Sequence, residues 1–225
     1  MKLVIRFGGS VIASPIRPKL IGEYAEFLKK LRGENHSIVA VTGGGEIARQ
    51  FIKAARELGL REEIQDELAI KASRLVAELF QRKLGGDACS KIPTSVEEAK
   101  KCIDENKIVV MGGLKPGMTT DTVAVLIAKA INADMLVKAT DQEGIYTKDP
   151  QKHKDAKLLK KVKIEDLEKI LEEDKHKAGI HQILDPEAIK ILKTLKIRLV
   201  VVNGFKPENI LLAIKGENIG TLVEV

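Results

Sequence analysis

The sequence contains no tryptophan and few other aromatic residues, which together make up 3% of its 225 residues. A core without many large rings must be built from aliphatic side chains, and the hydrophobic content of 44% supplies them. No apolar run approaches the roughly 18 residues that a membrane-spanning helix needs. We therefore expect a soluble globular protein with no signal peptide and no membrane partner.

Cysteine is also scarce. Cys89 and Cys102 fit neither a disulfide framework nor the spacing of a zinc site, and the four histidines are scattered. We therefore expect reduced thiols, a cytoplasmic location and no metal site built from protein side chains.

The net charge of +6 raises the question of a nucleic-acid partner. However, 38 basic residues are interleaved with 32 acidic ones, as in "KKVKIEDLEKILEEDKHK", which is typical of a solvated helix with ion pairs. The sequence has no RNA-binding strand pattern, no zinc finger and no long basic tail. We expect no nucleic-acid partner, and the modest positive balance suits an anionic small molecule.

Apolar strand-like runs alternate with helical patterns along the whole chain, without an evident linker. This alternation predicts an α/β fold in which one domain, residues 1–225, has a mainly parallel sheet between two layers of helices. The predicted strands cover residues 3–7, 38–41, 107–111, 135–139, 198–202 and 221–225, with a further short strand near 89–92. The predicted helices cover residues 18–32, 46–58, 62–84, 96–105, 120–132, 164–173, 185–195 and 207–215.

Three consecutive glycines, Gly43 to Gly45, separate a predicted buried strand from a helix. Such a turn points unpaired N–H groups and the positive end of the helix at the space above the sheet, which suits an anion. A tight turn without a ligand is the plainer interpretation, but three glycines in a row favour a binding loop. The helix that follows is predicted to carry an apolar stripe of Ile47, Phe51, Ala54 and Ala55.

Polar, glycine-containing segments follow four of the predicted strands. They are "GGS" (8–10), "GGG" (43–45), "GGLKPGMTTD" (112–121) and "TDQEGIYTKDP" (140–150). Ligands of open α/β sheets bind beyond the carboxyl ends of the strands, so these four loops together predict a site.

Two familiar motifs are matched only in part. Gly43, Gly45 and Ala48 satisfy the dinucleotide fingerprint, which keeps an NAD-binding Rossmann-type oxidoreductase as an alternative. That fold needs an acidic residue at the end of a second strand, whereas the acids of residues 62–67 lie in a helical pattern. The spacing in "GLKPGMT" resembles a P-loop, but Met118 stands where the lysine belongs, so we reject a Walker-type site.

With all four loops in view, the chain resembles the amino acid kinase superfamily, and within it the archaeal uridylate (UMP) kinases, over all 225 residues. The motifs "GGGEIAR", "GLKPGMTTDTVA", "KATDQEGIYTKDP" and "ILDPEAIKIL" match in order and spacing. The resemblance implies a three-layer αβα sandwich whose N-terminal part binds the acceptor and whose C-terminal part binds ATP. It also implies transfer of the ATP γ-phosphoryl group to UMP in pyrimidine nucleotide biosynthesis, Mg2+ carried on ATP phosphates, and a homohexamer.

The resemblance also assigns roles to individual residues. Arg49, Arg6 and Asp121 would be catalytic, with Arg49 reaching the transferred phosphate and Asp121 organising cationic groups. ATP would be bound by Gly9, Ser10, Gly45, Arg49, Thr140, Asp141, Tyr146 and Asp149. UMP would be bound by Gly44, Asp66, Leu114, Lys115, Pro116, Gly117, Met118, Thr119 and Thr120.

Three positions depart from the family pattern. Arg6 replaces a lysine that is common there, Asp141 stands where asparagine is frequent, and Glu143 replaces an aspartate. Arg6 keeps the charge of the lysine but not its geometry, so whether it replaces the lysine functionally stays open.

Several of these residues also have purely structural interpretations. Asp66 could be a solvated helix acid, Thr119 a helix N-cap, and Asp149-Pro150 a turn. Asp185-Pro186 could begin a helix. A kinase of the same fold acting on another phosphate or carboxylate, and a non-catalytic nucleotide- or oxyanion-binding protein, remain alternatives.

Overall fold

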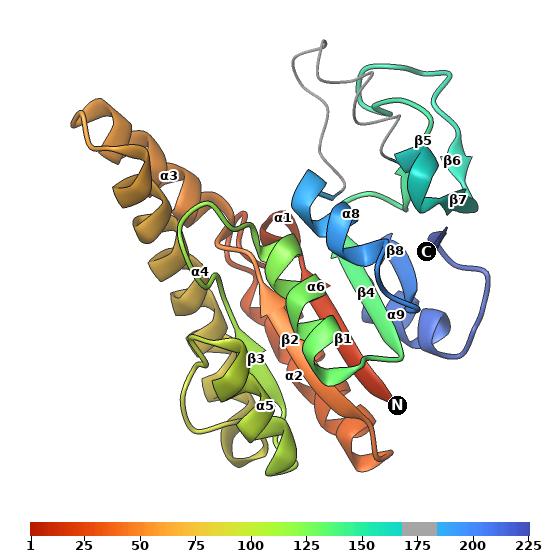
Figure 1. The fold of residues 1–225 in the computed structure, drawn as a ribbon, viewed down its shortest axis with the longest axis horizontal. Helices are drawn as coiled ribbons and strands as arrows, with labels where there is room; N and C mark the ends of the chain where they lie inside the picture. The colour runs from red at the N-terminus through yellow and green to blue at the C-terminus, as the bar shows by residue number, and fades with distance from the viewer. Residues whose placement is uncertain (168–183) are drawn as a thin grey trace.

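The computed structural model describes residues 1–167 and 184–225, and nearly all their strands join one sheet (Figure 1). The strands are β1 (Lys2–Phe7), β2 (Ser37–Thr42), β3 (Val109–Met111), β4 (Met135–Thr140), β7 (Lys161–Lys163), β8 (Arg198–Asn203) and β9 (Thr221–Glu224), with β5 (Ile145–Tyr146) and β6 (Leu158–Leu159) forming a separate antiparallel pair. The order in the sheet is β3–β2–β1–β4–β8–β9–β7. All neighbours are parallel except β8 and β9.

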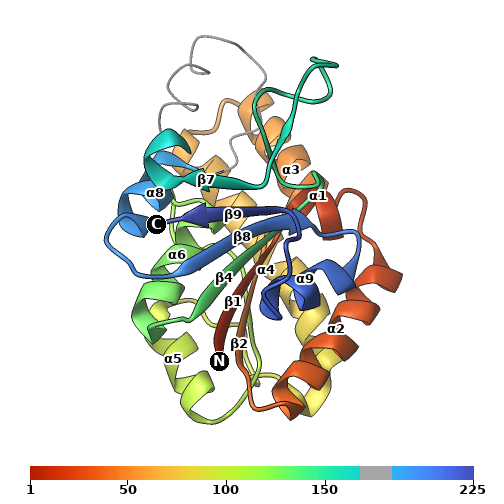
Figure 2. The same ribbon diagram turned by 90° about the vertical axis from the view of Figure 1, so that its right-hand side faces the viewer.

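Helices cover both faces of this sheet (Figure 2). They are α1 (Gly9–Ile12), α2 (Pro18–Gly33), α3 (Gly45–Glu57), α4 (Glu62–Leu84), the 3-10 turn η1 (Gly85–Asp87), α5 (Val96–Asp104), α6 (Thr120–Ile131), α8 (Pro186–Leu192) and α9 (Pro207–Ile214). The buried side chains form two clusters, one under α2, α4 and α9 and the other under α5, α6 and α8. The predicted three-layer αβα sandwich with a mainly parallel sheet is therefore confirmed.

Strand β1 lies in the middle of the sheet and shows why both faces are apolar. Leu3, Ile5 and Phe7 belong to one buried cluster, whereas Val4 belongs to the other, as the alternation of a strand requires. Three of the scarce aromatic residues meet at the end of this strand, where the Phe7 ring lies 4.5 Å from Tyr24 and 5.5 Å from Phe80. This aromatic cluster packs against the carboxyl end of β1 on the face of the sheet that α2 and α4 cover.

The secondary structure agrees with the sequence pattern in most places. The six main predicted strands are all found, but the further short strand near residues 89–92 is wrong, because only an isolated bridge between Ala88 and Ile108 forms there. The predicted helix 164–173 is helical over residues 164–167, and its remaining residues lie outside the described part. Helix α1 is too short to give a periodic signal.

The expectation of reduced thiols is wrong, because Cys89 and Cys102 form a disulfide. The Cα atoms of the two residues are 5.6 Å apart, within the range that a disulfide spans. The fold brings them together: the N–H of Cys89 donates to Ile108 O (3.0 Å), and the N–H of Lys107 donates to Cys102 O (3.0 Å). The separation of 13 residues between the two cysteines does not by itself predict that they are close in space.

The predicted apolar stripe of α3 does not pack into the core. Phe51 is 50% exposed, Ala54 is exposed, and of the stripe only Ala55 is buried. The cause is that α3 pairs with the N-terminal part of α4, and these two segments extend beyond the sheet as an arm (Figure 1), whereas the C-terminal part of α4 lies in the core. No helix in the described part of the chain is long and apolar enough to cross a membrane.

Candidate active site

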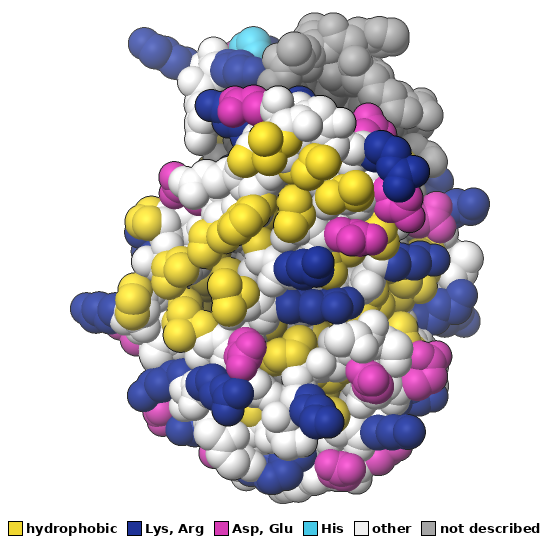
Figure 3. Space-filling model, turned by 90° about the vertical axis from the view of Figure 1, so that its left-hand side faces the viewer, with side chains coloured by type: hydrophobic (Ala, Val, Ile, Leu, Met, Phe, Trp, Pro, Cys, Tyr) yellow, Lys and Arg dark blue, Asp and Glu magenta, His cyan; other side chains and the backbone are white. Residues whose placement is uncertain are grey.

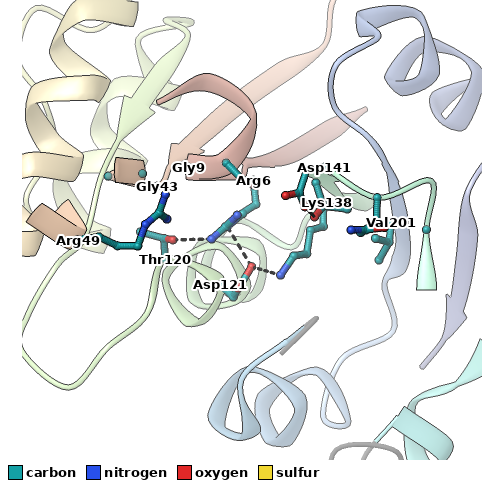
Figure 4. Close-up of a pocket in the computed structure, with 15 residues that line it drawn as sticks. Arg6, Gly9, Gly43, Arg49, Thr120, Asp121, Lys138, Asp141 and Val201 are labelled. Atoms are coloured by element: carbon teal, nitrogen blue, oxygen red, sulfur yellow. Dashed lines mark hydrogen bonds and ion pairs between the residues drawn. The ribbon is translucent and has the colours of Figure 1, made fainter. Parts of the chain in front are cut away.

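A cleft of about 310 Å³ opens at the carboxyl ends of β1, β2 and β4 (Figure 4). We call it the glycine cleft, because the glycine loops after β1 and β2 form one of its walls. The opposite wall comes from the N-terminus of α6 and the loop after β4. The residues lining it are Arg6, Gly9, Ser10, Gly43, Gly44, Gly45, Arg49, Thr120, Asp121, Lys138, Thr140, Asp141, Gln142, Gly144 and Val201.

The two glycine loops touch each other through their backbones. A Cβ atom on Gly9 would lie 2.6 Å from the Cα of Gly45, and one on Gly43 would lie 2.8 Å from the nitrogen of Gly9. Gly45 also has a φ of 59°, which side-chain-bearing residues rarely adopt. The glycines are therefore required for packing as well as for access to the cleft.

Two cations and one carboxylate meet at the floor of the cleft. Arg6 on β1 and Lys138 on β4 are neighbours in the parallel register, and like charges side by side repel each other. Asp121 from α6 separates them: its Oδ1 lies 2.8 Å from Lys138 Nζ and 3.0 Å from Arg6 Nε. The Arg6 Nε contact is an ion pair rather than a directed hydrogen bond, whereas Arg6 Nη2 donates to Thr120 Oγ1 at 3.0 Å.

The ionisation of this group follows from its burial and its charges. Burial opposes the charge of Asp121, but Arg6 and then Lys138 outweigh it and hold the pKa of the carboxyl below its usual range. Burial lowers the pKa of Lys138, Asp121 offsets part of this, and Arg6 lowers the pKa further. With all three groups charged, Arg6, Lys138 and Asp121 together carry one net positive charge, and the charge of Asp185 acts on Lys138 as well, raising its pKa.

Arg49 lies on the first turn of α3 and lines the same cleft. Its side chain is exposed, and Nη2 donates to Ser14 Oγ at 2.8 Å. The partner of the guanidinium, on the loop before α2, is neutral. The positive charge of Arg49 is therefore available to bind an anion between the glycine loops.

A second cleft of about 430 Å³ lies beside the first, between α4 and the loop that joins β3 to α6. We call it the α4 cleft. Asp66 lines it and accepts a hydrogen bond from the N–H of Gly117 at 2.7 Å. The residues lining it are Gly44, Ala48, Ile52, Asp66, Ala69, Ile70, Ser73, Gly113, Lys115, Gly117, Met118, Thr119 and Thr120.

Gly44 and Thr120 line both clefts, so the two clefts meet at these residues. Thr120 is also the residue that accepts the hydrogen bond from Arg6. Two ligands occupying the two clefts would therefore approach each other beside Arg6.

Comparison with known proteins gives the family of this fold and site. The model of the amino acid kinase family matches residues 1–203. The chain belongs to the amino acid kinase family.

Its similarity to particular members extends over the whole chain. A uridylate kinase of Methanocaldococcus jannaschii is 41% identical over 226 residues, covering 100% of both chains. One of Sulfurisphaera tokodaii is 41% identical, covering 100% of this chain and 99% of the relative. The crystal structure of an Archaeoglobus fulgidus uridylate kinase has a TM-score of 0.89 and 36% identity, covering 99% of this chain and all of that one.

Within this family fold, the alternative of an NAD-binding oxidoreductase is not supported. Its fingerprint needs a second strand after the glycine-loop helix, but residues 62–84 form the single helix α4 there. The acids of residues 62–67 accordingly lie on a helix rather than at a strand end.

Most of the predicted site residues come together, and a few lie apart. Leu114 lines neither cleft and packs against the buried cluster under α6, and Pro116 lines neither cleft. Tyr146 lies on β5, and Asp149 forms a turn in which its Oδ1 accepts the N–H of Gln151 at 2.9 Å.

Thr119 and Asp185 act together at the starts of two helices. Thr119 caps α6 by accepting N–H groups of residues 121 and 122, and Asp185 caps α8 by accepting the N–H of Ala188. Asp185 also accepts the hydroxyl of Thr119 at 2.5 Å and that of Thr122 at 2.8 Å. The capping interpretation of both residues therefore holds, and the two caps fasten α8 to α6.

The residues that line the glycine cleft without having been predicted are Gly43, Lys138, Gln142, Gly144 and Val201. Lys138 had a recognisable signal, because a charged residue in a buried central strand needs a partner and lies near the strand's carboxyl end. Gly43 and Gln142 belong to loops that the sequence predicts to form the site, but neither residue has a predicted role of its own.

We expect Asp121→Asn to lower the free energy of unfolding by about 3 kcal/mol at pH 7, because it removes the buried carboxylate with which both Arg6 and Lys138 pair. Since the pKa of Asp121 is depressed, its contribution is present above the ordinary carboxyl pKa of about 4 and is lost as the pH falls below it. Urea unfolding should therefore show the difference from the wild type narrowing in acid.

The matched control is Asp155→Asn, which removes an exposed ion pair with Lys148 and should leave unfolding nearly unchanged. An Asp121→Asn variant as stable as the wild type at pH 7 would contradict the view that Asp121 neutralises the cluster.

Proposed function

We propose that this protein is a UMP kinase, which transfers the γ-phosphoryl group of ATP to UMP and yields UDP and ADP for pyrimidine nucleotide biosynthesis, including that of CTP, in the cytoplasm. The observation that carries this proposal is the meeting of two clefts at Gly44 and Thr120, beside the cluster of Arg6, Lys138 and Asp121. ATP occupies the glycine cleft and UMP occupies the α4 cleft. The uridylate kinases to which the chain is similar over its full length support this choice of substrate.

Transfer between the two ligands needs alignment and neutralisation rather than a covalent intermediate. An oxygen of the UMP phosphate attacks the γ-phosphorus in line, and negative charge spreads over the transferring group. The positive charges of Arg6 and Lys138 lie beside the place where the transferring phosphoryl group would be, and they offset its negative charge. Arg49 adds a planar fork that can bridge two oxyanions, and the N–H groups of the glycine loops add donors.

Mg2+ fits the donor set of the glycine cleft only as an ion carried on ATP. The acidic residues lining this cleft are Asp121 and Asp141, and Asp121 is paired with Arg6 and Lys138. Residues 1–167 and 184–225 contain no group of three or more His, Cys, Asp or Glu that could hold a metal. Asp141 is thus the carboxylate that could meet the ion, which would neutralise phosphate charge when bound.

Different parts of the site bind the two substrates. Asp66 and the loop from Leu114 to Thr120 belong to the UMP side, with Asp66 accepting hydrogen bonds from the ribose hydroxyls. Thr140 and Asp141 belong to the ATP side. Tyr146 and Asp149 lie farther along the same connection after β4, and we assign them to the adenosine end of ATP.

The reaction is tested with a coupled assay of ADP release over UMP, CMP, dUMP and small carboxylates. Turnover of UMP above the others supports the proposal, and turnover of a carboxylate instead would assign another kinase activity to this site. Binding of ATP and UMP without ADP release would identify a non-catalytic nucleotide-binding protein.

We expect the wild type to prefer UMP over dUMP in kcat/KM by about tenfold or more, since Asp66 would lose a ribose hydroxyl partner with dUMP. Asp66→Asn should narrow this ratio, and Glu67→Gln, an exposed neighbour on the same helix, should not. If Asp66→Asn lowers kcat/KM equally for UMP and dUMP, the role of Asp66 in binding the ribose is refuted. Its hydrogen bond to the loop at Gly117 would then be its only assigned function.

We expect Arg49→Ala to fold normally, because the side chain is exposed and its bond to Ser14 is replaced by water. Its kcat should fall by roughly 10² to 10³, or about 3 to 4 kcal/mol, the scale of one preorganised charge donor. ATP affinity by calorimetry should stay within about tenfold, and Arg49→Lys should recover part of kcat.

Arg56→Ala, in the last turn of the same helix, is the matched control and should keep full activity. Full activity of Arg49→Ala itself would refute the phosphate-clamp role.

The arm of α3 and α4 carries exposed apolar side chains that form a band across one face of the molecule (Figure 3). Leu58 is 75% exposed and Leu75 is 61% exposed, and Ile16 and Leu79 border a shallow hollow between the two helices. Contiguous apolar surface of this kind marks interaction sites. We assign this face to a second copy of the chain in a homo-oligomer, with the hexamer as the expected state.

We expect Leu75→Glu to lower the molar mass measured by light scattering at micromolar concentration, because it places a charge in the proposed contact. Lys100→Glu on α5, an exposed position on another helix, should keep the mass of the wild type. If the wild-type protein is a monomer under these conditions, the assignment of this face to a second copy of the chain is refuted.

A further inference from the structure

The loop between β3 and α6, residues 112–119, is held by one side of helix α4. Asp66, Ser73 and Arg74 all bond to this loop, and they recur at the spacing of a single helix face. Four of the residues that line the α4 cleft, Gly113, Lys115, Gly117 and Met118, belong to the central part of this loop. The position of the loop relative to α4 therefore sets the shape of the cleft.

Arg74 makes the most specific of these contacts. Its Nε donates to the carbonyl oxygen of Gly113 at 2.9 Å, and its Nη2 donates to that of Leu114 at 3.0 Å. Two consecutive carbonyls are thus held by one planar guanidinium, a geometry that a lysine ammonium cannot reproduce. Arg74 lines neither the glycine cleft nor the α4 cleft.

Ser73 completes the attachment at the start of the loop. Its Oγ accepts the N–H of Gly113 at 2.8 Å and donates to Ile70 O at 2.7 Å. A Cβ atom on Gly112 would lie 2.7 Å from the backbone nitrogen of Arg74, so loop and helix are in direct backbone contact. Both polar backbone groups of Gly113 are therefore bonded to α4.

We propose that Arg74 is a positioning residue for the acceptor: it fixes the loop at Gly113 and Leu114 and thereby sets the affinity for UMP without touching it. The assignment rests on the proposed function, because it takes the α4 cleft as the acceptor site. The hydrogen bonds of Arg74 go to Gly113 and Leu114, and neither of these residues lines the glycine cleft. Arg74 therefore acts on acceptor binding and leaves ATP binding unchanged.

The test compares Arg74→Met, Arg74→Lys and the control Lys71→Met, which removes one positive charge from an exposed position on the same helix. For Arg74→Met we expect the KM for UMP to rise about tenfold or more, with kcat within about threefold and the KM for ATP unchanged. Arg74→Lys should lie between Arg74→Met and the wild type, because one ammonium can keep one of the two carbonyls. Lys71→Met should behave as the wild type.

Hydrogen exchange gives a second readout that does not need UMP. The amide hydrogens of residues 113–115, 117 and 118 should exchange faster in Arg74→Met, and those of α6 and β4 should not. An unchanged KM for UMP in a folded variant would overturn the proposal, as would an equal rise in both KM values. If Arg74→Met does not fold, an unchanged KM for UMP in Arg74→Lys overturns it in the same way. Failure of the wild type to phosphorylate UMP would refute the proposed function, while the exchange measurement would still test the loop attachment.

Discussion

The pairing of Asp121 with Arg6 and Lys138 is the constraint on which the site depends. Two neighbouring strands place cations next to each other in a buried position, and this arrangement is stable only with an anion between them. Asp121 comes from α6, so the ion pairs also bind this helix to the central strands. One carboxylate for two cations leaves these three groups with one net positive charge, which an anion in the cleft could neutralise. The same ion pairs that hold α6 to the sheet therefore also set the charge at the floor of the cleft.

The glycine loops add a second constraint, which links distant parts of the chain. Because the backbones after β1 and β2 are in contact at Gly9 and Gly45, neither loop can carry a larger side chain at these positions without displacing the other. The hydrogen bond from Gly8 N to Ala139 O ties the first loop to β4 in turn. This wall of the glycine cleft is therefore formed by backbones in close contact rather than by adaptable side chains.

The sequence predicts the layers of the fold well because buried strands and amphipathic helices have clear periods, as β1 and α2 show. It also predicts the loops of the site, since the carboxyl ends of parallel strands must meet. It does not predict that Lys138 faces Arg6, which depends on strand order, nor that Cys89 meets Cys102, which depends on the packing of α5. The stripe of α3 is less buried than expected, because a periodic apolar pattern indicates one face of a helix but not how much of that face the fold covers.

Helix α4 has 23 residues and is therefore about 35 Å long, and it takes part in two surfaces at once. Arg74 holds the loop of the α4 cleft, and Leu75, the next residue, belongs to the exposed apolar face. A stiff rod of this kind transmits displacement along its length instead of absorbing it. A neighbour seated on Leu75 would thus brace the mouth of the α4 cleft, and the mechanical stiffness of that cleft would then depend on the neighbour as well as on the contacts within the chain.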